Sequence, residues 1–208
     1  MKLLSFVVIL LSLSVVGLSQ NEKNGLNSIA LSGGRISFGT GDFFGYGINL
    51  EYSKQLNPGK SFSKHFSLGA EISFENGDKQ PKVINPSAQD FFAKTYYNTT
   101  NIVITPKITY HPFNKTFAKG LIITAGISAG YTNQNREFQA SYYFDPTTQT
   151  SVRRSLLEYI NEVIGGYRIS AGYECQFKRI LAGVRLDFHN YTNGDANTLV
   201  ALKTGYRF

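Results

Sequence analysis

Apolar or aromatic residues alternate with small or polar ones in segments of about ten residues, and a polar turn follows each segment. This period of two is typical of β-strands that have two different faces. Eight segments show it, at residues 29–39, 44–54, 64–75, 100–111, 120–131, 164–175, 179–189 and 198–208. Each is close to the ~9–11 residues that a tilted strand needs to cross a bilayer. The pattern therefore predicts an all-β fold of eight long antiparallel strands.

The two faces differ in chemistry as well as in period. In the segment 100–111, Ile102, Ile104 and Ile108 share one face, while Lys107 shares the other with threonines. Tyrosines and phenylalanines gather near the ends of the apolar face, where the aromatic girdles of membrane barrels lie. Eight strands could not easily enclose so many aromatic rings, but they could enclose the small and charged set. We therefore expect an up-and-down transmembrane β-barrel with the apolar face outside.

A soluble exported barrel is the alternative that the strand pattern leaves open. It would place the apolar face inside, where it could bind a greasy ligand, and it would need no detergent. The location of the apolar residues in the folded chain discriminates between the two.

The start of the chain predicts export. Lys2 precedes an apolar stretch at 3–13, and small residues at Gly17 and Ser19 suit a signal peptidase. We expect a cleaved signal peptide at 1–19 and a single barrel domain at 20–208, without a helical anchor. The full chain has 21 Lys and Arg residues against 14 Asp and Glu residues. This excess is scattered, so it suits anionic lipopolysaccharide headgroups, and nucleic acid is not an expected partner of an exported chain.

Several charged residues fall on the polar face of the strands, where they are expected to pair with one another inside the barrel. An interior of eight strands is only wide enough for its own side chains, so we expect a salt-bridged plug and no transport. The predicted lumenal charge network consists of Arg35, Glu51, Glu71, Lys107, Arg168, Glu174, Arg185, Asp187, Lys203 and Arg207.

Connection lengths suggest where specific contacts are made. The connections at 76–99 and 132–163 are long and lie on the same side of the predicted barrel, which is the extracellular side if the N-terminus is periplasmic. We expect the fifth and sixth strands to continue above the membrane as a hairpin within 132–163. The aromatic candidates for contact with an extracellular protein, a surface or lipopolysaccharide are Phe91, Phe92, Tyr96, Tyr97, Tyr142 and Tyr143.

The last segment carries a resemblance to a known class. Apolar residues alternate through 199–208 and the chain ends on an aromatic residue, with Tyr206 and Phe208 in the last positions. This resembles the C-terminal signal that the barrel assembly machinery recognises in outer-membrane proteins. The whole chain looks like the small OmpA/OmpX-type barrels, and its Tyr- and Gly-rich style is similar to outer-membrane barrel-domain proteins of Bacteroidetes. The resemblance implies the outer membrane of a Gram-negative bacterium, with outer-membrane lipid around the barrel, and it carries no catalytic motif.

One stretch suggests an enzymatic alternative. His189 followed by Thr192 looks like the lipid A 3-O-deacylases, eight-stranded barrels in which the resemblance implies a His base, a Ser nucleophile and an acidic residue that orients the His. Here the hydroxyl belongs to Thr192, the spacing is one residue longer, and parity places His189 on the lumen side. We therefore expect a non-enzymatic protein with no cofactor and no metal site, since His65, His111 and His189 are scattered.

Overall fold

The chain forms one closed antiparallel barrel in which every strand pairs with its neighbours in chain order. The computed structural model describes residues 27–39, 43–56, 63–79, 97–112, 119–145, 147 and 150–208. The strands are β1 (Asn27–Phe38), β2 (Phe43–Gln55), β3 (Phe66–Lys79), β4 (Tyr97–Tyr110), β5 (Lys119–Asp145), β6 (Thr150–Phe177), β7 (Ile180–Tyr191) and β8 (Ala196–Arg207). A short 3-10 helix, η1 (Ser63–His65), precedes β3. In these ranges no helix has the length and apolar character needed to cross a membrane. The predicted eight-stranded barrel is confirmed.

Pairing of the first and last strands closes the sheet. Gly33 of β1 lies opposite Ile48 of β2 on one side and opposite Leu202 of β8 on the other. Beyond the last ladder pair, Asn27 donates its N–H to the carbonyl of Phe208 at 3.1 Å and accepts one from Phe208 at 2.9 Å. Within the barrel, closure gives the backbone groups of every strand partners on both sides, which is the condition for strands to lie in lipid. We call this end of the barrel the terminal end and the opposite end the hairpin end.

The apolar face of the strands lies on the outside. Ile102, Ile104 and Ile108 of β4 are each at least half exposed, while Thr105 and Lys107 between them are buried. The same alternation runs around the sheet and produces an apolar outer belt over a lumen that is polar for most of its length. An apolar interior, which the soluble alternative requires, is not what the described residues form. The belt has the chemistry of a surface in contact with lipid.

Toward the hairpin end, an apolar cluster lies in the lumen. The rings of Phe38 and Phe43 stack at 4.8 Å between centroids, and the ring of Tyr97 lies 4.9 Å from that of Phe43. Gly77 gives them room, because a Cβ there would stand 2.4 Å from the Phe38 ring. Tyr97 was expected in an exposed loop, and this is wrong: it begins β4 and packs half-buried against the cluster formed by Ile36, Phe38, Phe43, Leu199 and Ala201.

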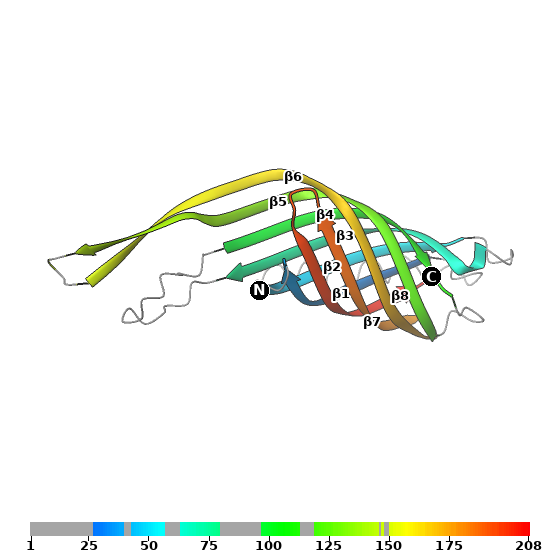
Figure 1. The fold of residues 1–208 in the computed structure, drawn as a ribbon. Coiled ribbons are helices and arrows are strands. Elements are labelled where there is room, and N and C mark those ends of the chain that lie inside the picture. The colour runs from blue at the N-terminus through cyan, green and yellow to red at the C-terminus, as the bar shows by residue number, and fades with distance from the viewer. Residues whose placement is uncertain are drawn as a thin grey trace.

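Strands β5 and β6 are twice as long as the others and leave the barrel together, as Figure 1 shows. The pairing of β4 with β5 ends at Tyr97 and Arg136, and the pairing of β6 with β7 begins at Gly166. Beyond these points β5 and β6 pair only with each other, as far as Asp145 and Thr150, with an irregularity after Glu137. The predicted hairpin is confirmed, and most of the connection expected at 132–163 is therefore strand.

Some predictions fall on residues that are not described. The signal peptide at 1–19 lies outside the described residues, and so do Phe91, Phe92 and Tyr96 with most of the connection at 76–99. These remain predictions from the sequence.

Candidate functional site

The charged side chains of the lumen come from six strands, β2, β3, β4, β6, β7 and β8. Small neighbours make room for them. Gly126 of β5 lies opposite both Lys107 of β4 and Arg168 of β6, and a Cβ on it would come within 3.0 Å of the Lys107 Cβ. An eight-stranded interior holds little more than its own side chains, so the absence of a side chain at such positions is what admits the long charged ones.

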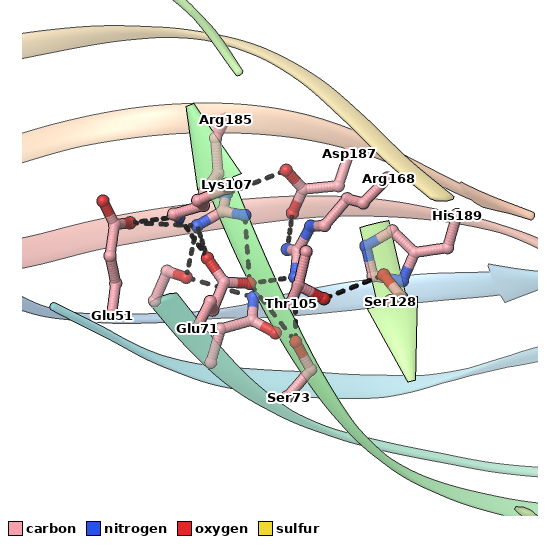
Figure 2. A network of polar contacts seen from close by, with 12 residues as sticks. Glu51, Glu71, Ser73, Thr105, Lys107, Ser128, Arg168, Arg185, Asp187 and His189 are labelled. Atoms are coloured by element: carbon pink, nitrogen blue, oxygen red, sulfur yellow. Dashed lines mark hydrogen bonds and ion pairs between the residues drawn. The ribbon is translucent and has the colours of Figure 1, made fainter. Parts of the chain in front are cut away.

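Glu71 lies at the centre of this network, and its side chain is fully buried. Its Oε2 accepts hydrogen bonds from Lys107 Nζ at 2.6 Å and from Arg185 Nη1 at 2.9 Å. Its Oε1 pairs with Arg168 Nη1 and accepts the Ser73 hydroxyl at 3.2 Å. Figure 2 shows these side chains converging from β3, β4, β6 and β7. One carboxylate therefore holds three cations, two of them from strands that do not pair with β3.

A second carboxylate, Asp187, binds two of the same cations. It accepts Arg168 Nη2 at 2.6 Å and Arg185 Nε at 2.8 Å. The Arg168 guanidinium is thus shared between two carboxylates, and that of Arg185, which also pairs with Glu51 at 3.5 Å, between three. Charged hydrogen bonds of this kind fix the geometry of the side chains.

Glu51 extends the network toward the terminal end. It pairs with Lys107 Nζ at 2.9 Å and with Lys203 Nζ at 2.9 Å, and Lys203 also pairs with Glu174. The ion pairs join four carboxylates, Glu51, Glu71, Glu174 and Asp187, with four cations, Lys107, Arg168, Arg185 and Lys203. The network is electrically balanced, which is the condition for keeping charges out of water.

Two members of the predicted network lie elsewhere. Arg35 is on the outer face, with its guanidinium 3.9 Å from the centroid of the Phe44 ring, so its assignment to the lumen is wrong. Directly paired residues share a face of a sheet, and Arg35 pairs with the outward Tyr46 and Val200. Arg207 lies at the mouth of the terminal end, where it donates to Gln176 Oε1 at 2.6 Å.

A further polar cluster lies between the charge network and the apolar cluster. The Glu75 carboxylate pairs with His189 Nδ1 and accepts hydrogen bonds from the Tyr191 hydroxyl at 3.0 Å, Asn101 at 3.0 Å and Asn197 at 2.9 Å. Glu75 is not among the residues predicted for the lumenal charge network. The signal was present, because Glu71, Ser73 and Glu75 share one parity in β3.

The same cluster bears on the enzymatic alternative. His189 is only 2% exposed and faces the lumen, and within the described part of the chain no group hydrogen-bonds its buried Nε2. The Thr192 hydroxyl accepts the Gly165 N–H at 3.1 Å in an exposed turn instead. A hydrolytic triad needs a hydroxyl on the free nitrogen of the His, at a place that the substrate reaches. His189 has a carboxylate partner, but it lacks that hydroxyl and lies away from the lipid-facing rim.

The remaining candidate residues lie at the two ends. Tyr142 and Tyr143 belong to β5 in the hairpin, opposite Arg153 and Val152 of β6. At the terminal end the Tyr206 hydroxyl accepts a hydrogen bond from Arg179 at 3.3 Å, and Phe208 follows β8. Recognition of Tyr206 and Phe208 by the barrel assembly machinery stays a prediction.

The closed sheet, the apolar belt and the ion-paired lumen together define an integral membrane β-barrel of the outer-membrane type. No family model matches the chain, and no curated protein matches it in sequence at a significant level.

Several solved structures are similar to this chain. The chain is similar to Ail, the attachment invasion locus protein of Yersinia pestis, at 12% identity and a TM-score of 0.49, covering 88% of this chain and 97% of that one. It is similar to Neisserial surface protein A at 9% identity and a TM-score of 0.46, covering 89% and 98%. For a major outer membrane protein from Thermus thermophilus the values are 10%, 0.47, 88% and 99%.

Proposed function

We propose that this chain is a non-enzymatic outer-membrane barrel whose specific contacts are made outside the cell, through the β5–β6 hairpin and the connection at 76–99. The observation that carries the proposal is the hairpin itself, because its strands continue past the last pairing partner on either side. Strands that leave a membrane barrel no longer serve to cross the membrane, and their side chains and backbone edges are available to a partner.

The root of the hairpin is fixed to the barrel. Gln134 of β5 donates to Asp195 in the β7–β8 turn at 2.5 Å, and Arg136 of β5 pairs with Glu158 of β6 at 2.7 Å. The Thr192 N–H binds the Gly165 carbonyl at 2.8 Å. The bonds of Gln134 and Gly165 join the hairpin root to the β7–β8 turn, while the Arg136–Glu158 pair joins the two strands of the hairpin to each other.

The outward face of the hairpin root is apolar and exposed. Val163 is 81% exposed and Tyr159 is 66% exposed, and Leu157 lies on the same face of β6. Aromatic and aliphatic side chains of this kind are typical of protein-binding surfaces. Their exposure supports a protein or solid surface as the partner, with lipopolysaccharide as the other expected partner.

The side chains inside the barrel support a function other than transport. The charge network and the apolar cluster of Phe38 and Phe43 fill successive levels of the interior. The Bacteroidetes-like origin and the cleaved signal peptide remain predictions that accompany this proposal.

The proposal is tested with cells that export either the whole chain or a variant in which a two-residue Asn-Gly turn replaces 138–156. Attachment is measured on protein-coated glass, bare glass and lipopolysaccharide-coated glass. We expect the truncated barrel to insert normally, as judged by faster migration of the unboiled protein, and to lose most attachment on at least one surface. A full-length Tyr159→Ser/Val163→Ser variant is the matched control for the apolar face alone. Equal attachment of all three proteins on every surface would refute the proposal.

A further inference from the structure

A polar patch interrupts the apolar outer belt at the level where the hairpin leaves the barrel. Arg35 of β1 is exposed on the outer face, and the neighbouring outward positions toward the hairpin end are Ser37 and its cross-strand partner Thr198 of β8. Their side chains make no hydrogen bond or ion pair to another residue in the described ranges. The guanidinium of Arg35 and the two hydroxyls thus have hydrogen-bond donors that no residue in the described ranges uses.

The arginine leans toward the hairpin end of the barrel. Its guanidinium lies over the ring of Phe44, and Phe44 is opposite Ser37, two residues closer to the hairpin end than Arg35 itself. Tyr46, directly opposite Arg35, is half exposed like Phe44, and its ring lies 6.2 Å from that of Phe74. Aromatic rings at this level mark the interface between lipid tails and headgroups. The side chain therefore reaches from the apolar belt toward the headgroups, as long cationic side chains near membrane interfaces do.

We propose that Arg35, Ser37 and Thr198 bind the phosphate of a phosphorylated glycolipid in the outer leaflet, with Phe44 holding the guanidinium in place. The planar fork of arginine matches two phosphate oxygens, and the hydroxyls donate to the third. The acyl chains of the same lipid would lie against the outward residues Tyr46 and Val200.

A second arginine at the same end shows why Arg35 differs from an ordinary surface cation. Arg136 is also exposed, but its Nε pairs with Glu158 at 2.7 Å. Its charge is already neutralised by a carboxylate, so it serves as the matched control. The site is independent of the hairpin surface proposed above, since none of its residues belongs to β5 or β6.

Native mass spectrometry of the purified barrel in detergent micelles tests the site. The probes are bis-phosphorylated lipid A, the same lipid with its phosphates removed, and inorganic phosphate. We expect Arg35→Gln to raise the apparent Kd for the phosphorylated lipid about five-fold, the effect of one cation at a membrane surface. Arg136→Gln should leave it unchanged, and neither variant should alter binding of the dephosphorylated lipid.

Two further variants keep the test decisive. Arg35→Glu should abolish the preference for the phosphorylated lipid, and Ser37→Ala/Thr198→Ala should weaken binding by less than Arg35→Gln does. Folding of each variant is checked by the faster migration of unboiled protein. Unchanged binding by Arg35→Gln, or equal binding of both lipids by the wild type, would overturn the proposal. Competition by millimolar inorganic phosphate would overturn the lipid as the source of the phosphate.

Discussion

Replacing Glu71 with Gln tests the electrostatic balance of the lumen most directly. The substitution keeps the shape of the side chain but removes the charge that Lys107, Arg168 and Arg185 share. Three carboxylates then face four cations in a region that water reaches poorly. Breaking a buried ion pair by removing one partner typically costs about 3–5 kcal/mol, because the other charge is left uncompensated. We expect Glu71→Gln to lower the free energy of unfolding by about this amount.

The measurement is urea unfolding of the barrel in detergent micelles, followed by the fraction of unboiled protein that migrates as the compact form. Glu158→Gln is the matched control, since it breaks the exposed ion pair with Arg136. An exposed pair contributes less than about 1 kcal/mol, so this variant should unfold near the wild-type midpoint.

A double variant separates charge imbalance from loss of packing. Glu71→Gln combined with Lys107→Met leaves three carboxylates with three cations, and it should recover part of the lost stability. If Glu71→Gln alone changes the unfolding free energy by less than about 0.5 kcal/mol, the range of an ordinary surface substitution, the lumenal network does not stabilise the barrel as argued.

Three other predictions are tested by urea unfolding, in detergent micelles or, where stated, in a lipid bilayer. Gly77→Ala should cost about 1–3 kcal/mol because its Cβ would meet the Phe38 ring at 2.4 Å, whereas Gly33→Ala, with no contact under 3.6 Å, should be close to neutral. Leu202→Arg, at an outward position that is 72% exposed near the middle of β8, should cost about 2–4 kcal/mol in a lipid bilayer and much less in the absence of a bilayer. Burial lowers the pKa of His111, just beyond β4, to about 4, so the unfolded chain binds the proton first and stability should fall as the pH drops from about 6.5 to 4. His111→Asn should reduce that loss of stability. If the variant and the wild type lose stability equally over this pH range, His111 is not the group responsible.

The charge network also shows where alternation in the sequence is enough to assign a residue to the inner or outer face of a strand, and where it is not. Alternation along β2, β3 and β4 is unambiguous, because one face is apolar and the other polar, and Glu51, Glu71 and Lys107 were assigned to the lumen from it. In β1 apolar residues occur on both faces, since Ile36 faces inward and Leu31 outward. The alternation in β1 therefore did not show which face is polar, and Arg35 was assigned to the wrong face. Only pairing with β2 and β8 decides which face of β1 meets the lumen.

The sequence by itself determined the number of strands, their order, the hairpin extension and the chemistry of the two faces. These properties follow from the local period of two and from segment lengths that match the membrane. Which side chains meet is different, because it depends on register and closure across the whole sheet. Glu75 and His189 are 114 residues apart and come from strands that do not pair, and the same is true of Glu71 and Arg168, 97 residues apart. Contacts across the lumen exist only once the sheet has closed, so the tertiary structure alone decided them.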